Sequence, residues 1–498
     1  MTDLTKNPDL RSREKIDDYF GDWKWREGLA ELMVPIVGRL YRHGVRIMIY
    51  GQSLVNKSPI DIMHAHRFVR QIEENELSEL ETYPLLERLS KMDLPDCEVD
   101  IGELAMRCSF FHDLPNNPDS IDSFLQEQIS VDGLGAKRPD QPRDIVLYGF
   151  GRIGRLMARM LAQTTGPGNY FRLKGVVVRK TGENDLIKRA SLLRRDSVHG
   201  RFDGTIRVDL ENEFLVINGN PVKFIYANSP VDVNYSDLNI NSPIVIDNTG
   251  IWRDEEALSQ HLTSGASKVI LTAPAKGDIR NIVFGVNDSA LQKSDQIISA
   301  ASCTTNAIVP VLKLISDHYG ISNGHIETVH SYTNDQNLID NFHKGDRRGR
   351  SAPLNMVITT TGAVKAVSKA IPELKDKLTG NAIRVPTPNV SLAVLVLNLE
   401  NSVERDELNE FLKKSAFASK YREIIGYTNS PEAVSSDFYS SPYATIIDSQ
   451  ATIADGKQIT LYCWYDNEYG YTKQVLNLTK KVASIDLQRF PKAIEDSL

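Results

Sequence analysis

The spacing of apolar residues differs between the first quarter of the chain and the rest. Before about residue 130, apolar positions recur at intervals of three and four, the period of a helix with one buried face. The set with the clearest helical spacing is Leu29, Leu32, Met33, Ile36, Val37 and Leu40. Ser58-Pro59 marks another helix start, and further helical patterns cover 76–92 and 99–112. Because strand-like runs are nearly absent, residues 1–132 are predicted to form an all-α N-terminal extension.

A second region begins after GLGAKRPDQPRD at 133–144, whose Gly, Pro and charged residues predict a linker. Short apolar runs then alternate with helical or loop segments, which is typical of βαβ units around a parallel sheet. These runs lie at 145–150, 175–178, 243–249, 268–273 and 296–301. From about 320 to 470 the segments are longer and richer in β-forming residues. The pattern predicts an α/β domain over 145–302 and an α+β domain over 303–470.

The composition is that of an ordinary globular protein. Hydrophobic residues make up 41% and charged residues 25% of the 498 positions, which excludes a largely disordered, collagen-like or coiled-coil chain. The net charge of −7 predicts no general affinity for nucleic acid or an anionic membrane. The longest aliphatic stretch, 391–399, is shorter than the ~20 residues that span a bilayer. Residues 1–15 contain no apolar core of a secretory signal, so we expect a cytoplasmic protein.

Charge is distributed unevenly along the chain. Residues 1–142 contain 17 Lys and Arg against 26 Asp and Glu, a balance of −9, so the remaining residues carry +2. The acidic part coincides with the predicted helical extension. This difference separates the extension from the rest of the chain in composition as well as in pattern.

No pattern in the sequence predicts a metal site. The four cysteines are too few and too scattered for a disulfide scaffold or a metal-binding CxxC pair, and we expect them to be reduced. They are Cys97, Cys108, Cys303 and Cys463. His64 and His66 lie two residues apart on a predicted helix, so their side chains point to different sides and cannot bind one ion.

A glycine-rich turn follows the first strand of the predicted α/β domain. Gly149, Gly151 and Gly154 form a GxGxxG pattern between the run at 145–150 and the helical segment RLMARMLAQ. The first glycine permits a tight turn, the second lets a pyrophosphate approach the backbone, and the third lets the helix pack on the strand. The amides at the helix N-terminus then face the anion. The pattern therefore predicts a dinucleotide site in a Rossmann domain, with a tight turn without ligand as the alternative.

The end of the second strand bears on which dinucleotide is bound. An NAD site usually has an acidic residue there for the adenosine ribose hydroxyls, but the run GVVV ends in Arg179-Lys180. Two cations could pair with a 2′-phosphate, which favours NADP. Two exposed basic residues without such a role are the alternative, so the preference between NAD and NADP stays open.

Cys303 is the candidate nucleophile. It lies between the apolar run at 296–301 and a helical segment, so we expect it at a helix N-terminus, where the helix dipole lowers the pKa of its thiol. A thiolate is the form that covalent catalysis needs. His330 follows in a strand-like run and could accept the thiol proton. The alternative is a buried structural cysteine beside an unrelated histidine.

Eight ordered motifs resemble the phosphorylating glyceraldehyde-3-phosphate dehydrogenase family over about residues 143–485. They are GFGRIGR, ASCTTN, HSYTNDQ, RRGRSA, TTTGAVKAV, PELKDKLTG, RVPTPNVS and WYDNEYGYT. The resemblance implies a Rossmann domain completed by a C-terminal helix at 471–498, and a catalytic domain with a mostly antiparallel sheet. The first ~140 residues lie outside it and look like the extension of a long bacterial form.

The resemblance also implies a reaction. Cys303 would add to the aldehyde of glyceraldehyde 3-phosphate, with His330 as base, and NAD or NADP would take up hydride. Inorganic phosphate would then cleave the thioester to 1,3-bisphosphoglycerate, in glycolysis or gluconeogenesis. Implied cofactor contacts come from Arg152, Ile153, Thr272 and Asn467. Implied ligands are Thr333 and Arg384 for the C3 phosphate, and Ser302, Thr304, Arg348, Thr361 and Gly362 for inorganic phosphate.

Two departures from the family pattern concern the cofactor. Arg179-Lys180 stands where NAD-specific members have an aspartate, and Asn341-Phe342 stands where they have Leu-Pro. Both changes fall where NADP-using relatives also differ. Use of NADP, or of both cofactors, is therefore a hypothesis alongside use of NAD.

Two other functions compete with this interpretation. Erythrose-4-phosphate dehydrogenase is a close relative, but it departs from the pattern around TTTGA and HSYTNDQ, which are intact here. A regulatory or adaptor role through the acidic extension is the second alternative. For the extension, the modest hypothesis is a helical module that packs on the enzyme or enlarges an oligomer interface. A homotetramer is expected from the resemblance alone.

Overall fold

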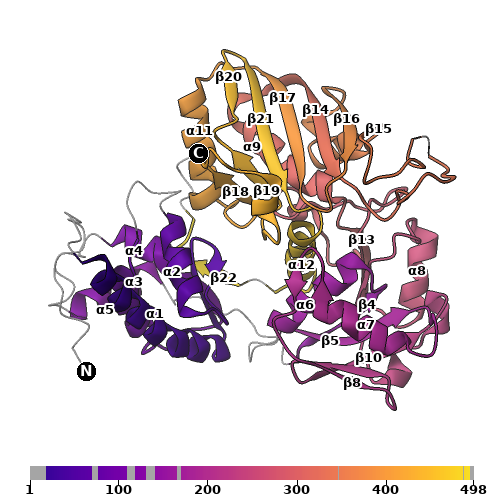
Figure 1. Ribbon diagram of the computed structural model, residues 1–498, viewed down its shortest axis with the longest axis horizontal. Coiled ribbons are helices and arrows are strands. Elements are labelled where there is room, and N and C mark those ends of the chain that lie inside the picture. The colour runs from indigo at the N-terminus through magenta and orange to yellow at the C-terminus, as the bar shows by residue number, and fades with distance from the viewer. Residues whose placement is uncertain are drawn as a thin grey trace. The chain divides into compact units, whose positions relative to one another are not determined.

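The computed structural model describes residues 18–69, 77–108, 118–129, 141–164, 170–345, 347–485 and 487–493. The chain forms two compact units. The first consists of 1–141 with the short segments 166–170 and 485–497, and the second of 142–165 and 171–484. Figure 1 colours the first unit mostly indigo to purple and the second from magenta to yellow. Most of the predicted linker at 133–144 lies outside the described residues.

Helices make up most of the described part of the first unit. The first, α1 (Tyr19–Arg42), begins after Asp18, whose carboxylate accepts the N–H of Gly21. The predicted apolar stripe is buried along α1 except at Leu32. The start predicted at Ser58-Pro59 is a capping box in which Ser58 and Asp61 satisfy each other's amides. The other helices are α2 (Pro59–Phe68), α3 (Glu79–Leu89), α4 (Ile101–Arg107) and α5 (Pro118–Gln128).

The first unit also contains a four-stranded sheet, which corrects the prediction of an all-α extension. Its order is β2-β1-β3-β22, in which β1, β3 and β22 are parallel. The strands are β1 (Val45–Ile49), β2 (Gln52–Ser53), β3 (Cys97–Asp100) and β22 (Gln488–Phe490). These strands are two to five residues long, which is too short for a period-two pattern to stand out in the sequence, so the pattern missed them.

The strand β22 comes from a part of the chain predicted to be helical. The C-terminal helix expected at 471–498 is α12 (Tyr469–Val482), and it ends before the chain enters the first unit. Arg489, on β22, is buried and its Nη2 donates to both Asp100 and Glu103 at 2.7 Å. The first unit therefore draws its sheet from residues at both ends of the described chain.

The first sheet of the second unit has the order β13-β12-β11-β4-β5-β10-β9-β8. Six strands are parallel, and β9 (Phe214–Ile217) and β8 (Ile206–Asp209) extend the sheet antiparallel. The parallel strands are β4 (Arg143–Tyr148), β5 (Phe171–Val178), β10 (Asn220–Tyr226), β11 (Ile244–Asp247), β12 (Lys268–Leu271) and β13 (Ile297–Ser299). Since the strand order reverses at β4, a topological switch point lies there, as in a Rossmann domain.

Helices connect the strands of this sheet. They are α6 (Arg152–Thr164), α7 (Asp185–Arg194) and α8 (Glu255–Thr263). The C-terminal α12 packs on α6 and on α9 (Cys303–Tyr319). The fold class predicted for this part of the chain, a Rossmann domain followed by a second sheet domain, is confirmed.

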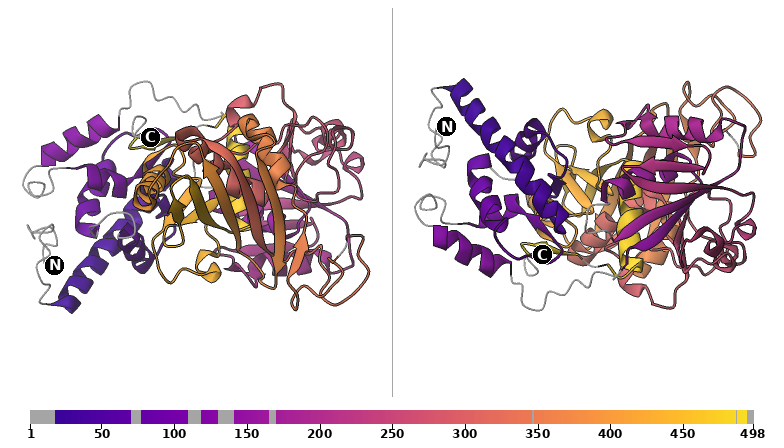
Figure 2. Two further views of the ribbon diagram at one scale, coloured as in Figure 1. Left: turned by 90° about the horizontal axis from the view of Figure 1, so that it is seen from above. Right: turned by 90° about the horizontal axis from the view of Figure 1, so that it is seen from below.

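The second sheet has the order β15-β16-β14-β17-β21-β19-β18, with β20 paired to β21. Most neighbours are antiparallel, but β14–β16 and β18–β19 are parallel. The strands are β14 (Ile321–Ser331), β15 (Val357–Thr359), β16 (Leu378–Val385), β17 (Ser391–Leu399), β18 (Ile425–Thr428), β19 (Thr445–Asp448), β20 (Ile453–Asp455) and β21 (Gln458–Tyr465). Figure 2 shows the orange and yellow strands of this sheet side by side. The apolar helix α9 packs against it, and α10 (Ala363–Ala370) and α11 (Arg405–Ala418) also contact it.

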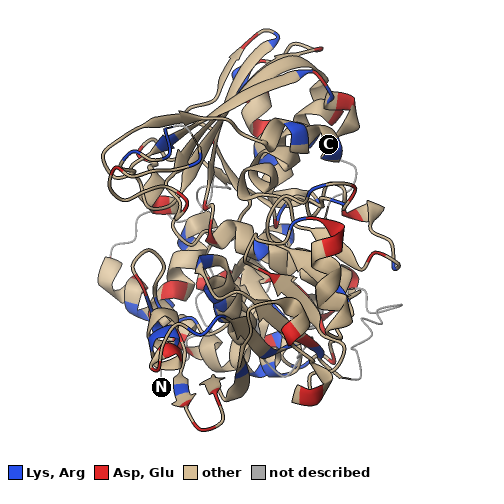
Figure 3. Cartoon of the chain, turned by 90° about the vertical axis from the view of Figure 1, so that its right-hand side faces the viewer, with Lys and Arg blue, Asp and Glu red and all other residues tan. Residues whose placement is uncertain are grey.

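Acidic and basic residues are interspersed on the described elements (Figure 3). Among the described residues, the structure contains no helix long and apolar enough to cross a membrane.

Candidate active site

The glycine turn leaves open space at its second glycine. Gly149 has φ +92°, and a Cβ there would come within 2.9 Å of Thr249. A Cβ at Gly154 would lie 2.4 Å from the carbonyl oxygen of Gly149, so only glycine allows α6 to start this close to β4. A Cβ at Gly151 would meet no atom within 4 Å. The turn therefore presents bare backbone and the N-terminal amides of α6, where Ile153 lies in the first turn, to a phosphate-sized ligand.

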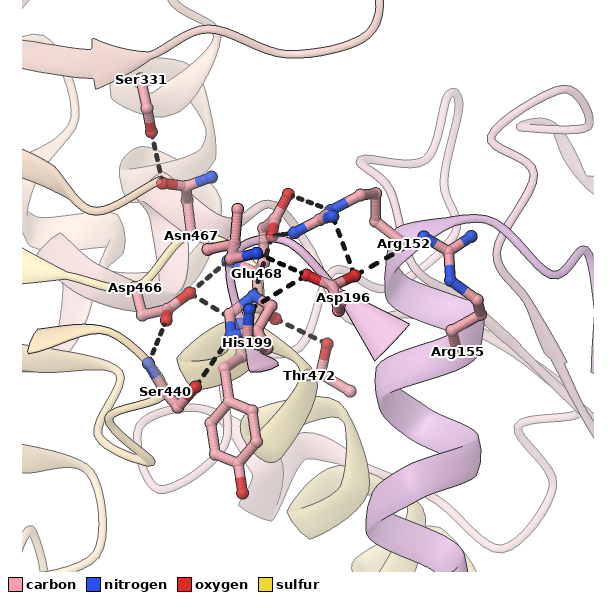
Figure 4. Close-up of polar contacts among 12 residues, drawn as sticks. Arg152, Arg155, Asp196, His199, Ser331, Ser440, Asp466, Asn467, Glu468 and Thr472 are labelled. Carbon is pink, nitrogen blue, oxygen red and sulfur yellow. Dashed lines mark hydrogen bonds and ion pairs between the residues drawn. The ribbon is translucent and has the colours of Figure 1, made fainter. Parts of the chain in front are cut away.

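The other predicted cofactor residues lie on several elements. Thr272 follows β12, and its hydroxyl donates to the carbonyl oxygen of Asp247 at 3.0 Å. Arg179 is exposed directly after β5, and its neighbour Lys180 lies 5.1 Å from the ring centroid of Tyr226. The side chain of Arg152 points to Glu468 and Asp196 (Figure 4). Arg152 thus contacts carboxylates of this chain.

Asn467 lies in the loop between β21 and α12. Its Oδ1 accepts hydrogen bonds from the hydroxyls of Ser331 at 2.8 Å and Ser391 at 2.9 Å. The amide nitrogen points away from Ser331 (Figure 4). Two serines of the second sheet therefore fix the orientation of this amide.

Cys303 is the first residue of α9. The chain leaves β13 and turns at Ala301, whose φ is +55°, before Ser302 caps the helix by accepting the N–H of Thr305 at 3.1 Å. This turn places the sulfur where the amide dipoles of α9 point. The Cys303 side chain keeps part of its surface accessible.

His330 faces Cys303 from the end of β14. Nε2 of His330 lies 3.6 Å from Sγ of Cys303. Nδ1 lies 2.7 Å from the carbonyl oxygen of Ser331, which only accepts; in the tautomer that makes this hydrogen bond, Nδ1 carries the proton and Nε2 offers a lone pair to the thiol. This is the tautomer in which an imidazole can accept a proton from sulfur.

The parallel register of β14 and β16 brings a cation to the same place. His330 is directly opposite Arg384, and Nη1 of Arg384 lies 3.0 Å from Nδ1 of the imidazole. This guanidinium nitrogen donates to the carbonyl oxygen of Ser331 at 3.3 Å, the oxygen that Nδ1 of His330 also contacts. Arg384 therefore places a positive charge beside both members of the thiol–imidazole pair.

These surroundings lower the pKa of His330 and raise the pKa of Cys303. Burial, with a smaller contribution from Arg384, lowers the pKa of His330 to about 3, so the imidazole is neutral near pH 7. Burial raises the pKa of the Cys303 thiol, while Arg384 and the hydrogen bonds at the start of α9 lower it. The net upward direction corrects the prediction from the sequence, which counted the helix dipole but not the loss of hydration.

A chain of polar contacts extends from Arg384 to a second arginine. Nη1 of Arg384 lies 3.5 Å from the Thr333 hydroxyl, which donates to Asp335. Asp335 in turn pairs with Nη1 of Arg348 at 2.6 Å. Burial raises the pKa of Asp335, but Thr333 and the two arginines lower it below its ordinary value. Three of the predicted phosphate ligands are thus linked to one another.

The remaining predicted phosphate ligands have local partners. The hydroxyl of Thr361 accepts the N–H of Ala363 at 3.2 Å, and Gly362 is the N-cap of α10. A Cβ at Gly362 would meet no atom within 4 Å. The Thr304 hydroxyl contacts that of Tyr465 at 3.0 Å inside the protein. The structure therefore ties Thr304 into the protein interior, while Gly362 borders open space.

Sequence reasoning missed the carboxylates that organise the site. Asp335 lies in the TNDQ motif and Glu468 in the DNEYG motif, so both residues are close to candidate positions. Nothing in one sequence shows that their partners are the arginines at 348 and 152. Those pairings depend on the folded register.

The fold and site define a dinucleotide-binding oxidoreductase with a thiol–imidazole pair. Residues 143–255 match the family model described as the NAD binding domain of glyceraldehyde 3-phosphate dehydrogenase, and residues 302–467 match that of its C-terminal domain. The chain belongs to the glyceraldehyde-3-phosphate dehydrogenase family. It is an NAD(P)-dependent oxidoreductase of that family, and the resemblance predicted from the eight motifs is confirmed.

The chain is similar to relatives of two lengths. A glyceraldehyde-3-phosphate dehydrogenase-like protein of Pseudomonas aeruginosa (strain UCBPP-PA14) is 52% identical over 465 residues, covering 92% of this chain and 100% of the relative. Glyceraldehyde-3-phosphate dehydrogenases of Zymomonas mobilis and Geobacillus stearothermophilus are 40% and 41% identical, over 68% of this chain. The similarity extends over 98% of the Zymomonas protein and 97% of the Geobacillus protein. The Pseudomonas protein therefore matches most of the first 141 residues as well.

Proposed function

We propose that the chain is a phosphorylating glyceraldehyde-3-phosphate dehydrogenase. It oxidises glyceraldehyde 3-phosphate with NAD or NADP and inorganic phosphate to 1,3-bisphosphoglycerate. The observation that carries the proposal is the 3.6 Å contact of Cys303 Sγ with Nε2 of His330, beside Arg384. The family supplies the substrate class, and the pair supplies the covalent chemistry.

In this mechanism, Nε2 of His330 accepts the thiol proton as Sγ of Cys303 attacks the aldehyde carbon. The proton passes to the aldehyde oxygen, giving a hemithioacetal. The bound dinucleotide serves as hydride acceptor at the nicotinamide. As hydride leaves the carbon, the hydroxyl proton returns to Nε2 and a thioester remains. A phosphate oxygen then attacks the thioester, and the leaving sulfur of Cys303 regains the proton from His330.

Cations account for the binding of two anions in one site. Arg384 and Thr333 hold the C3 phosphate of the substrate, and Arg348 helps to hold inorganic phosphate. Asp335 orients Arg348 through the 2.6 Å pair. The remaining phosphate ligands are Ser302, Thr304, Thr361 and Gly362. Charge-assisted hydrogen bonds of this kind are the strong ones, especially where water is excluded.

The dinucleotide is held at three places in this proposal. The turn at Gly149, Gly151 and Gly154, with the amides of residues 152–153, binds the pyrophosphate. Thr272 lies near the cofactor, and Asn467 bonds the nicotinamide carboxamide. Arg179 binds a 2′-phosphate if NADP is used. A large preference for NAD in kcat/KM would contradict that role of Arg179.

A homo-oligomer, expected to be a tetramer, completes the proposal. Large apolar side chains are exposed in one segment of the second unit, and an exposed apolar segment of this size typically marks an interface. They are Leu338, Ile339, Phe342, Leu354, Met356 and Ile358, of which Phe342 is 90% exposed. A second copy of this chain would cover them. Light scattering of the full chain that shows a monomer would contradict this part of the proposal.

Initial rates of NADH and NADPH formation test the function. We expect turnover of glyceraldehyde 3-phosphate that depends on inorganic phosphate. Cys303→Ser should lower kcat by about 10⁴ or more, since the hydroxyl is a poor nucleophile beside this imidazole, while Cys108→Ala, in the first unit, should keep it. Faster oxidation of erythrose 4-phosphate would instead support the related dehydrogenase. A cellular effect that survives Cys303→Ser would support a regulatory or adaptor role of the acidic extension.

A further inference from the structure

A partly buried polar network joins the start of α6 to the loop between β21 and α12 (Figure 4). Nε of Arg152 donates to Oε1 of Glu468 at 2.8 Å, and Nη2 donates to Oε2. Nη1 donates to Oδ2 of Asp196 at 3.0 Å. One guanidinium thus holds two carboxylates that lie 44 and 316 residues away in the sequence.

Glu468 has a second partner in His199. Nε2 of His199 lies 2.9 Å from Oε2 of Glu468, and Nδ1 lies 2.9 Å from the Ser440 hydroxyl. Because a carboxylate only accepts hydrogen bonds, Nε2 carries a proton. The His199 side chain is 2% exposed, so this contact is shielded from solvent. Burial raises the pKa of Glu468, but His199 and Arg152 lower it below its ordinary value, which keeps the carboxylate ionised.

Asp466 fixes the backbone of the same loop. Its Oδ1 accepts the N–H groups of Glu468 at 2.9 Å and Tyr469 at 2.7 Å, and its Oδ2 accepts that of Ser440 at 2.8 Å. Asp466 therefore holds the loop through backbone N–H groups, and Arg152 and His199 hold it through the side chain of Glu468. Asn467, between these two acidic residues, has little freedom to move without breaking one of the two sets of contacts.

Each residue of the Arg152–Glu468 pair directly follows a residue that the proposed function places at the cofactor. Arg152 directly follows Gly151, the glycine of the open turn, and Glu468 directly follows Asn467. The pair therefore connects the two places that the proposed function assigns to the pyrophosphate and to the nicotinamide carboxamide. A displacement of one place is transmitted to the other through a bidentate contact, which is geometrically specific.

We propose that Glu468 is a positioning residue that holds Asn467 at a fixed distance from the pyrophosphate turn. It acts through Arg152, and it sets how much binding free energy the nicotinamide end adds to that of the ADP-ribose part. The inference rests on the proposed function, in which Asn467 contacts the carboxamide. Both carboxylate oxygens of Glu468 are engaged by Arg152 and His199, so its role is to position neighbouring groups.

Calorimetric titration of the full chain tests this role with two ligands. One is whichever of NAD and NADP binds the wild-type chain more tightly, and the other is the same molecule without nicotinamide, ADP-ribose or its 2′-phosphate. For Glu468→Gln we expect the Kd of the whole dinucleotide to rise about tenfold and that of the fragment to change less than twofold. A tenfold change equals about 1.4 kcal/mol of lost contribution from the nicotinamide end.

Two further variants serve as comparisons. Glu404→Gln, the same chemical change at an exposed glutamate, should leave both affinities unchanged. Glu468→Asp keeps the charge on a shorter side chain and should show a partial effect, which keeps the test available if the glutamine variant does not fold. Equal weakening of both ligands, or no weakening of either, would overturn the inference. If the nicotinamide end adds no affinity in the wild-type chain, the role of Asn467 fails together with the inference.

Discussion

At the scale of single residues, the chemistry of Cys303 is set by neighbours with opposing effects. Burial raises the pKa of its thiol, whereas Arg384 and the amides of α9 lower it. The neutral imidazole of His330 lies 3.6 Å away and can take the proton only when the sulfur attacks. The resting pair is therefore a thiol beside an imidazole, and an anionic substrate would be drawn by Arg384 and not by a preformed ion pair.

The lowered pKa of His330 makes the protein less stable in acid. Its pKa of about 3 lies below the ordinary value of 6.5, so between these values the unfolded chain binds a proton that the folded chain excludes. The free energy of unfolding therefore falls as the pH drops from 6.5 towards 3, by about 1.4 kcal/mol per pH unit from this group. Denaturant unfolding of His330→Gln between pH 4 and 7 should show a shallower dependence, and an identical slope would contradict this assignment.

At the scale of elements, two glycines of one turn have different constraints. At Gly154 a Cβ would lie 2.4 Å from a backbone oxygen that cannot move aside, but at Gly151 it would meet open space. The third glycine serves the packing of α6 on β4, whereas the second is assigned to the ligand by the proposed function. The same residue type thus serves packing at one position and, in the proposal, binding at the other.

We expect Gly154→Ala to lower the melting temperature by several degrees, because a clash of this kind costs about 1–3 kcal/mol. Gly151→Ala should keep the melting temperature within about 1 °C and weaken dinucleotide binding, because the new methyl group occupies the approach of the pyrophosphate. Differential scanning calorimetry and dinucleotide titration of both variants measure the difference. If Gly151→Ala bound the dinucleotide as tightly as the wild-type chain, the turn would not be the pyrophosphate site.

Elements with strong local signals were predictable from the sequence. The GxGxxG turn, the cysteine at the start of α9 and the order of the apolar runs led to the Rossmann domain and to the family. The pair of Arg152 and Glu468 was not predictable, because it joins residues 316 positions apart. The direction of the Cys303 pKa also needed the structure, because desolvation depends on what packs around the sulfur.

At the scale of the whole molecule, the first unit is built from segments at both ends of the chain. The chain leaves the first unit for the second and returns to it with β22, which pairs with β3 in parallel. The extension is therefore not an independent segment placed before an enzyme. Deletion of residues 1–142 would leave β22 without its sheet, so such a deletion also removes the packing of Phe490, which is fully buried.

Arg489, on β22, links this strand to buried acidic residues of the first unit. It donates to the buried Asp100 and Glu103, so Arg489→Met would remove a cation from beside two buried carboxylates. We expect a loss of about 3–5 kcal/mol in the first unit, the usual cost of breaking a buried pair. Hydrogen exchange of the amides in β1 and β3 should accelerate, while that in β14 and β16 should not. Lys492→Met, at an exposed neighbouring position, should leave every rate unchanged.

The pairing of β22 with β3 also fixes an order of events during translation. Arg489 is made 389 residues after Asp100, which at ordinary ribosomal speeds of 5–20 residues per second is an interval of about 20 to 80 s. Throughout that time β3 lacks its pairing with β22, and Asp100 and Glu103 lack their contact with Arg489. The first part of the polypeptide to emerge is therefore the last to reach its finished form.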